Sequence, residues 1–508
     1  MRNIKMKKLL AGIIMLSAIG ITSCNKFKDF DDTNVDPNSS TYVSTGTLLS
    51  TVQIRLANNL FGTTTGNNSP ASELLSGYLA QYFAEPTYPQ ASLYSPSSLA
   101  VSTNAPYQGV LFDLKKVIDR NSADDTKEDA AKSGSNSSQI AMARIMKAYI
   151  YWVITDKWGN VPYSEALLAS ENLTPGYDAQ EAIYTDLLKE LREAKDQFDN
   201  GMTVNADLVY NGNTGQWKKL ANSLRMLISL RMSKVYPASS GVAAQEFAAA
   251  ASDADGYIAS NADNLKIYFP ANANPYNNPY NGPFSSADNG ISETYTKLLT
   301  GLGDTRVSAH ASNTTGVPYG DRSPASTAIS WGRILSDANK AKTGTVHLIN
   351  AASVLLAAAE AAQLSWIAGS AQDFYNQGVT ASFNQWGVSM PANYLTTGKA
   401  NFTSGGGVDD IGGVFVPGAS ATTTTPLQRI QLQQYIAYFP DGHQGWSNWR
   451  RTGVPGLKPT VEALNDSKQI SRRFTYGPID YQTNAEKVSA AAGAMGGDND
   501  AIKVWWDK

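Results

Sequence analysis

Six aromatic residues stand in long polar segments of the chain, where their types suit contact with a sugar. Sugar rings present C–H faces that pack on aromatic planes, and Tyr and Trp offer rigid contact area at little entropic cost. Asn277, Asp321 and Arg322 lie near them in sequence and can hydrogen-bond hydroxyl groups. We expect these nine residues to form a ligand site on loops 60–108 and 268–335; the alternative is that the rings pack only their own loops. The aromatic candidates are Tyr88, Tyr94, Tyr276, Tyr280, Phe284 and Trp331.

Catalytic and metal-binding motifs are missing from the sequence. The three histidines, His310, His347 and His443, are widely spaced and match no HExxH pattern, and none has a visible partner for a catalytic triad. No G-x-S-x-G or GxxxxGK motif is present. A single Cys allows neither an internal disulfide nor a Cys-based zinc site. We expect a protein that is not an enzyme and uses no cofactor or metal.

A helical glycoside hydrolase remains as a less favoured alternative. It would need two carboxylates about 5–9.5 Å apart across an aromatic cleft. Asp288, Glu293, Asp304 and Asp321 are near the aromatic loops, but no motif pairs them.

The composition favours an uncharged ligand. Only 17% of the 508 residues are charged, against about 25% in an average domain, while 10% are aromatic. The chain has 41 basic and 44 acidic residues. A nucleic-acid-binding protein would need a basic excess, so that class is excluded.

The N-terminal sequence indicates a lipoprotein signal peptide. Four basic residues precede an apolar stretch at 9–21, which is too short to span a membrane. Ile21-Thr22-Ser23-Cys24 then resembles the bacterial lipobox, in which the cysteine is acylated. We expect a signal peptide at 1–23, an acylated Cys24 anchored in outer-membrane lipid, and a tether over 24–47. The acidic run Asp29, Asp31, Asp32 resembles the surface-export signal of Bacteroidetes lipoproteins, and the alternative is a solvated leader.

Apolar residues at helical spacing recur through the remaining domain, residues 48–508. Asp178 and Glu181 have the spacing of a capping box before one of these helices. The Gly/Thr-rich insert 391–426 is expected to be flexible or a short hairpin. The pattern predicts a mainly α-helical domain with helices at 139–156, 179–198, 215–235, 242–260, 346–367, 370–385 and 427–439.

Several segments together resemble the SusD/RagB family, in particular its second SusD-like branch. Asp156-Lys157-Trp158-Gly159-Asn160-Val161-Pro162-Tyr163 is similar to the family's turn after a helix, and residues 351–362 are similar to its Ala-rich helix, with Ser353 in place of the usual first Glu. The most specific match is Gly445-Trp446-Ser447-Asn448-Trp449-Arg450-Arg451-Thr452-Gly453-Val454-Pro455. Residues 472–476 and 504–507 resemble the closing motifs.

The resemblance implies a scaffold of tetratricopeptide-like helix pairs with a loop-rich subdomain packed against it. It implies a non-catalytic lipoprotein on the surface of Bacteroidetes, which delivers glycans, or in some members peptides, to a SusC-like TonB-dependent transporter. Trp446, Trp449, Arg450 and Arg451 could bind a sugar or an anion. Because they stand in a segment shared by the family, we instead expect them to fasten the C-terminal subdomain to the helices.

Overall fold

The computed structural model describes residues 43–61, 72–270, 278–321, 329–403 and 425–508. The chain divides into two compact units, residues 1–44 and 45–508, and nearly all of the described residues belong to the second. The expected signal peptide, Cys24 and most of the expected tether lie outside the described residues, as does most of the insert 391–426. None of the helices in the described ranges is long and apolar enough to cross a membrane.

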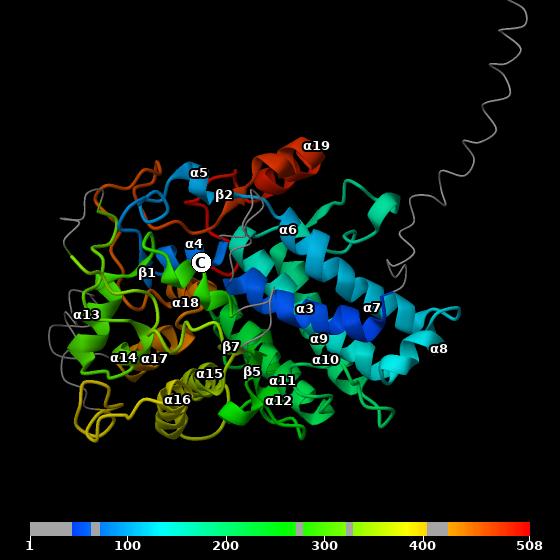
Figure 1. The fold of residues 1–508 in the computed structure, drawn as a ribbon, viewed down its shortest axis with the longest axis horizontal. Coiled ribbons are helices and arrows are strands. Elements are labelled where there is room, and N and C mark those ends of the chain that lie inside the picture. The colour runs from blue at the N-terminus through cyan, green and yellow to red at the C-terminus, as the bar shows by residue number, and fades with distance from the viewer. Residues whose placement is uncertain (1–42, 62–71, 271–277, 322–328, 404–424) are drawn as a thin grey trace, which may run out of the picture. The chain divides into compact units, whose positions relative to one another are not determined.

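Helices that follow one another in the chain pack side by side and build most of the unit 45–508 (Figure 1). Seven helices, whose bounds are given at the end of this paragraph, form this stack. In chain order, each of the first four packs on the next one. α11 and α12 both contact α15, and α15 packs on α16. The predicted mainly α-helical class, with its helix-pair scaffold, is confirmed. In chain order, the stack consists of α7 (Phe112–Ser122), α9 (Asn136–Trp158), α10 (Gln180–Asp196), α11 (Thr214–Arg231), α12 (Val242–Ala251), α15 (Ala351–Gln363) and α16 (Ala371–Trp386).

The longest helix shows why the sequence pattern predicts these elements well. Met142, Ile145 and Trp152, which are apolar residues at helical spacing on α9, are fully buried. The helix begins after Ser135, whose side chain accepts the Ser138 N–H at 3.3 Å. It ends at Gly159, which has a φ of +87° that favours glycine.

Two predicted helices are shorter than expected. The helix predicted at 242–260 ends at Ala251. The one predicted at 346–367 begins only at Ala351, because residues 344–349 form strand β7 (Gly344–Ile349) and pair antiparallel with β5 (Leu265–Phe269). The run Thr-Val-His-Leu-Ile suits a strand, and Asn350 caps the helix that follows by accepting the Ser353 N–H at 2.8 Å.

The predicted capping box before α10 is wrong. Ala179 occupies the N-cap position, and the Asn160 side chain accepts the N–H of Gln180, the first residue of the helix, at 3.1 Å. The Asp178 carboxylate instead accepts the N–H groups of Tyr163 and Ser164, at 3.1 and 2.9 Å. These bonds hold β4 (Tyr177–Asp178) against β3 (Val161–Pro162).

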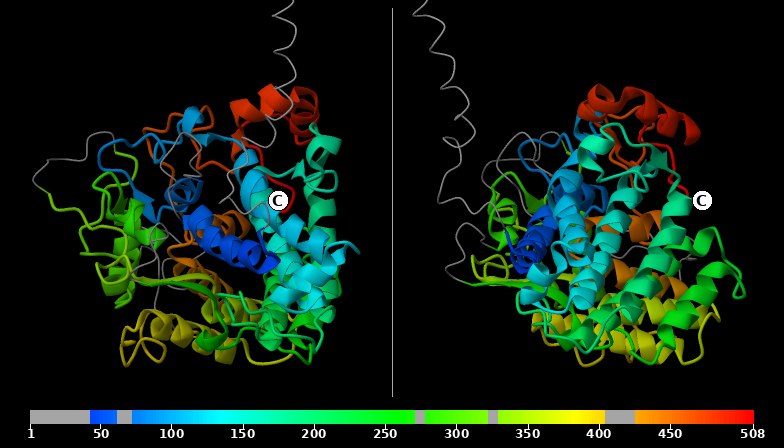
Figure 2. Two further views of the ribbon diagram at one scale, coloured as in Figure 1. Left: turned by 45° about the vertical axis from the view of Figure 1, so that its right-hand side comes forward. Right: turned by 90° about the vertical axis from the view of Figure 1, so that its right-hand side faces the viewer.

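The C-terminal part of the chain returns to the helical stack. α17 (Pro426–Tyr438) packs on α15, α18 (Gly442–Thr452) packs on α17 and α4, and the Phe474 N–H donates to Lys157 O at 2.8 Å. α19 and α16 lie at opposite ends of the unit (Figures 1 and 2). The remaining elements are α3 (Thr45–Phe61), α4 (Ser72–Leu79), α5 (Pro96–Leu99), α6 (Asn104–Pro106), α8 (Lys127–Ala130), α13 (Glu293–Leu302), α14 (Val307–His310), α19 (Pro478–Ala494), the antiparallel pair β1 (Phe83–Ala84) and β6 (Gly290–Ile291), and the parallel pair β2 (Ala100–Val101) and β8 (Thr475–Tyr476).

Candidate ligand-binding site

A groove with a volume of about 530 Å³ lies where four segments distant in sequence meet. Its size falls within the range of small-molecule sites, roughly 300–1,000 Å³. Most of the side chains around it carry hydroxyl, amide or charged groups. It is lined by Gln81, Glu293, Thr294, Tyr319, Gly320, Asp321 and residues 456–462.

A short irregular ladder of backbone hydrogen bonds positions one wall of the groove. β1 pairs with β6. The Ile291 carbonyl accepts the Val317 N–H at 2.8 Å, and the Ile291 N–H donates to the Gly332 carbonyl at 2.9 Å. α13 begins directly after β6, with the Ser292 side chain accepting the Thr294 N–H at 3.1 Å. Glu293 and Thr294, in the first turn of this helix, therefore stand beside the segments that carry Tyr319 and Trp331.

The opposite wall, residues 456–462, and the residues that follow it are held in place by hydrogen bonds to three separate segments. The Thr460 hydroxyl donates to the Gly320 carbonyl at 2.8 Å, and Gln81 Nε2 donates to the Lys458 carbonyl at 2.7 Å. Farther along, the Leu464 N–H donates to the carbonyl of Leu93 at 2.7 Å.

Gly320 is required where these two walls meet. Its φ is +64°, and a Cβ built there would approach Thr460 to 2.5 Å. Any larger residue would push the walls apart, so this glycine sets how closely they approach.

Tyr319, which lines the groove, packs against a second tyrosine, Tyr94. Tyr94 is fully buried, with its ring centroid 6.3 Å from that of Tyr319. The Tyr319 hydroxyl donates to the Tyr78 carbonyl at 2.7 Å. Burial raises the pKa of Tyr94 to about 12 and raises that of Tyr319 well above its ordinary value. Both hydroxyls therefore stay uncharged near neutral pH.

Of the six predicted contacts that the structure describes, one lies in the lining of the groove. Asp321 lines the groove. Trp331 is partly exposed and adjoins Gly332 of the ladder. Tyr88 is 63% exposed and stands on the segment whose Leu93 binds the far wall. These three keep an accessible surface for a ligand.

Three other predicted contacts have a packing role instead. Tyr94 packs against Tyr319, Tyr280 stacks on Phe284 with centroids 5.1 Å apart, and Phe284 contacts Phe83 at 5.2 Å. Each ring is at most 3% exposed, so none offers a face to a ligand, and the prediction is corrected for these three. Tyr276, Asn277 and Arg322 lie outside the described residues.

Sequence reasoning missed the wall at 456–462 entirely. Gly456 and Pro459 mark it as a loop, but nothing in its composition indicates a ligand site. Val461 on this wall is fully exposed, and Leu464, two residues beyond the wall, is 38% exposed. Only the folded chain brings these apolar side chains next to a polar groove.

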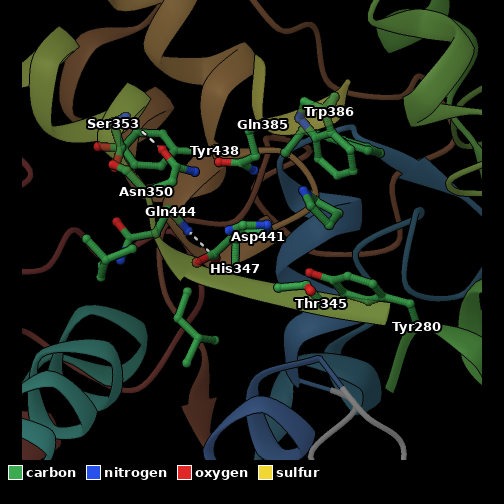
Figure 3. A pocket seen from close by; sticks show the side chains of 14 residues that line it. Tyr280, Thr345, His347, Asn350, Ser353, Gln385, Trp386, Tyr438, Asp441 and Gln444 are labelled. Carbon is green, nitrogen blue, oxygen red and sulfur yellow. Dashed lines mark hydrogen bonds between the residues drawn. The ribbon is translucent and has the colours of Figure 1, made fainter. Parts of the chain in front are cut away.

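A second, interior pocket is too small for a sugar (Figure 3). Its volume is about 20 Å³, space for a single water, between β7 and the start of α18. His347 lines it, and burial together with nearby Lys266 lowers the pKa of this histidine to about 4. Asp441 also lines it and caps α18 by accepting the Gln444 N–H at 2.9 Å.

The other two histidines are also unsuited to acid–base chemistry. Burial, with the charge of Arg306, lowers the pKa of His310 to about 3, and its ring lies against Tyr295 and Phe439. Burial likewise lowers the pKa of His443 well below its ordinary value. A general base needs a pKa near the working pH and access to substrate, which buried, neutral histidines lack.

One of the four carboxylates considered for glycoside hydrolysis is buried in the core and paired there. Asp304 is buried and receives the Arg306 guanidinium at 2.6 Å and the Tyr394 hydroxyl at 2.6 Å. Arg306 lowers the pKa of Asp304 although burial opposes this. Glu293 pairs with Lys297 at 2.8 Å on the surface of α13. Asp253 and Asp255, whose spacing resembles the start of a calcium loop, bind Lys195 at 3.0 and 3.1 Å.

The tryptophan and arginine cluster fastens the C-terminal part, as predicted. The Arg450 guanidinium lies 3.7 Å from the Trp446 ring centroid and 4.6 Å from that of Trp506. It also donates to the Asp156 carbonyl at 2.8 Å. Trp506 Nε1 donates to the Asp156 carboxylate at 2.7 Å. These groups are buried, so they connect α9, α18 and the C-terminus and do not meet a ligand.

Comparison with known proteins gives one family. Residues 37–477 match the SusD-like_2 family model, described as starch-binding associating with outer membrane. A search of curated proteins found no match.

Solved structures of similar fold cover nearly the whole chain. A chitin-binding SusD homolog from Flavobacterium johnsoniae is 26% identical, with a TM-score of 0.71 over 91% of this chain and 98% of that one. The structure of another chain named as a chitin-binding protein is also 26% identical, with a TM-score of 0.72 over 91% and 100%. A SusD homolog from Bacteroides uniformis is 27% identical, with a TM-score of 0.71 over 91% and 99%.

Proposed function

This chain belongs to the SusD-like family, and on that premise we propose that it is a non-catalytic lipoprotein that binds a glycan at the groove between Gly320 and the wall 456–462. The glycan then passes to a SusC-like TonB-dependent transporter in the outer membrane. Cys24, acylated after removal of residues 1–23, would hold the chain at that membrane.

The observation that carries the proposal is the combination of polar and apolar side chains in and near the groove. Fully exposed Val461 and a mostly polar set of side chains line the groove, while exposed Tyr88 and partly exposed Trp331 belong to segments that are hydrogen-bonded to its walls. Apolar and aromatic surfaces pack on the C–H faces of a sugar, while hydroxyl, amide and carboxylate groups bind its hydroxyls. An open surface groove also suits one stretch of a longer chain.

Chitin fragments are the first ligands to test, because two of the similar structures are of proteins named as chitin-binding. The experiment is calorimetric titration with chitin and starch oligosaccharides and with unrelated peptides. We expect binding of at least one oligosaccharide with no release of new reducing ends. Reducing-end release that disappears in Glu293→Gln would favour the hydrolase alternative, and binding of peptides alone would overturn the glycan proposal.

Substitution of the exposed aromatics tests the location of the site. We expect Tyr88→Ala and Trp331→Ala each to weaken glycan binding by about tenfold, since a lost aromatic contact costs about 0.5–1.5 kcal/mol beyond its area. Tyr268→Ala is the matched control: Tyr268 is 65% exposed, but it lies on β5, outside the segments of the groove. Equal losses in all three variants, or none in any, would place the site elsewhere.

The transporter partnership is tested in the native organism. Tagged protein, isolated in a detergent that keeps outer-membrane complexes intact, should carry a large β-barrel protein with it. Recovery without any barrel protein would contradict delivery of the glycan to a transporter. It would not affect the glycan titration, which tests ligand binding separately.

A further inference from the structure

The turn that follows α4 carries a glutamine in a backbone conformation that favours glycine. Gln81 has a φ of +56°, in the left-handed region. Its N–H donates to the Tyr78 carbonyl at 2.8 Å, and the N–H of Tyr82 donates to the Gly77 carbonyl at 2.9 Å. These two bonds form a Schellman motif, in which the left-handed position is usually glycine. A glutamine there is strained, and backbone strain is concentrated at functional sites.

The side chain of Gln81 lines the groove, although the residue is only 2% exposed. Its Nε2 donates to the Lys458 carbonyl at 2.7 Å. Because a carbonyl oxygen only accepts hydrogen bonds, the atom that faces Lys458 must be the amide nitrogen. This bond therefore fixes which way the amide is turned, and with it the position of the amide oxygen, Oε1.

Oε1 is the acceptor that this arrangement leaves for a ligand. The amide also lies beside the Tyr94 hydroxyl and lowers the pKa of that hydroxyl, as an N–H donor does, against the larger opposite effect of burial. Both neighbours thus meet the nitrogen. Within the part of the chain that the structure describes, no residue donates a hydrogen bond to Oε1, and this atom is not fully buried. An acceptor at the edge of a groove suits a sugar hydroxyl or amide N–H.

We propose that Gln81 is a ligand-contacting residue: Oε1, held in place by the bond from Nε2 to the wall 456–462, accepts a hydrogen bond from a hydroxyl or acetamido N–H of the bound glycan. Glycine, which the backbone conformation favours, would offer no such acceptor. The fixed amide loses little freedom when the ligand binds, so most of the new hydrogen bond counts toward affinity. This inference rests on the proposed function and names one atom through which the groove recognises its ligand.

Holding the wall in place is the other role that Gln81 could have, and Thr460 allows the two roles to be separated. The Thr460 hydroxyl donates to the Gly320 carbonyl at 2.8 Å and accepts the Glu462 N–H at 3.2 Å. Thr460→Val keeps the shape of the side chain and removes both bonds. It therefore loosens the same wall without removing the acceptor of Gln81.

Calorimetric titration with whichever of the chitin and starch oligosaccharides binds the wild type distinguishes these roles. Gln81→Met should weaken binding roughly tenfold or more, because a donor of the ligand is then buried without a partner. Thr460→Val should weaken it less than about threefold, since the bonds at Lys458 and Leu464 still hold this part of the chain. Equal losses in the two variants, or no loss in Gln81→Met, would overturn the proposal.

Gln81→Asn keeps the test decisive if Gln81→Met fails to fold. Asparagine tolerates the left-handed conformation better than other residues with a side chain, glycine aside. Its amide is one CH₂ shorter and cannot reach both the wall and the ligand. We expect Gln81→Asn to unfold cooperatively like the wild type and to bind the oligosaccharide more weakly than Thr460→Val does. Binding as tight as that of the wild type would contradict the contact.

The ¹³C signal of the Gln81 side-chain carbonyl reports the contact directly. In protein labelled at glutamine Cδ, the signal that is missing from Gln81→Asn should move downfield when the oligosaccharide saturates the wild type, because an accepted hydrogen bond draws electron density from the carbonyl. If the wild type binds while this signal stays in place, the contact fails and the proposed function stands. If no oligosaccharide binds the wild type, both fail.

Discussion

Arg450 and Arg451 are adjacent in sequence but enter two different buried networks. Arg450 stacks on Trp446 and reaches α9. Arg451 turns toward α15, where its two terminal nitrogens each donate to a Glu360 carboxylate oxygen at 2.7 Å. Glu360 also accepts from Gln431 and Gln434, at 3.0 and 2.9 Å. One short stretch of α18 is thus fixed to two helices by charge-assisted bonds.

Removing Arg451 should destabilise the fold strongly. Glu360 is 2% and Arg451 5% exposed, and a buried ion left without its partner costs about 3–5 kcal/mol. We expect Arg451→Met to lower the free energy of unfolding by that amount in urea denaturation. Arg451→Met with Glu360→Leu should recover much of it, since no charge is then stranded. Lys115→Ala, at a surface pair with Asp119, should change stability by less than about 1 kcal/mol; a loss as large as that of Arg451→Met would contradict the argument.

The same pair predicts sensitivity to acid. Burial disfavours a charged Glu360, but Arg451 and its other hydrogen-bond donors hold its pKa below the ordinary value. A group with a depressed folded-state pKa contributes stability that is present above its unfolded value, near 4.5, and is lost as the pH falls through the folded value. Stability measured from about pH 6 down to about pH 3 should fall less steeply in the double variant than in the wild type.

At the scale of elements, one glycine of α18 lies very close to the segment that joins α4 to β1. A Cβ built on Gly445 would lie 2.4 Å from the Tyr82 ring, whose hydroxyl donates to the Tyr435 carbonyl. The ring also contacts Tyr295 and Phe439, with centroids 5.0 and 5.4 Å away, so it has little room to move. The position of α18 against this segment therefore depends on the absence of a side chain at Gly445.

We expect Gly445→Ala to destabilise the protein by about 1–3 kcal/mol, the usual cost of overpacking a core. Gly493→Ala, in α19, is the control, because no atom of the described residues lies within 4 Å of the Cβ built there. That change should be neutral or stabilising by up to about 1 kcal/mol, as alanine favours a helix. Thermal unfolding of both variants measures the difference; equal melting temperatures would mean that α18 can shift without cost.

At the scale of the whole molecule, the proposed lipid anchor at Cys24 would place the groove at the membrane. A single acyl chain gives only marginal membrane binding, at about 0.8 kcal/mol per buried CH₂, whereas two or more anchor stably. The only cysteine of the chain stands directly after the expected signal peptide. The expected mature chain carries 37 basic and 44 acidic residues, a net charge of −7, which gives it no electrostatic attraction to anionic lipid.

Anchoring should therefore depend on Cys24 alone. We expect Cys24→Ala to move the protein from the outer-membrane fraction to the soluble fraction and to abolish labelling by a fatty-acid analogue. Glycan affinity of the purified protein should be unchanged, because the groove belongs to the separate unit 45–508. Retention of the variant in the membrane fraction would argue against lipid anchoring.

The helical class was predictable because it depends on local periodicity. Apolar residues at helical spacing predicted α9, α10, α11, α16 and α17 to within a few residues. Local patterns misjudged 346–349, where pairing with β5 draws the segment into a strand. They also misjudged Asp178, whose carboxylate is used by a neighbouring turn.

The groove could not be predicted in the same way, because its walls come from segments hundreds of residues apart. Composition drew attention to Asp321, which lines the groove, and to Tyr88 and Trp331, which keep accessible surface, but it gave the same weight to Tyr280 and Phe284, which the fold buries. An aromatic ring in a polar loop is equally suited to binding and to packing. Local sequence determines the helices, the expected anchor and the kinds of side chain available; only tertiary packing decides which rings meet solvent, because burial depends on neighbours supplied by the rest of the chain.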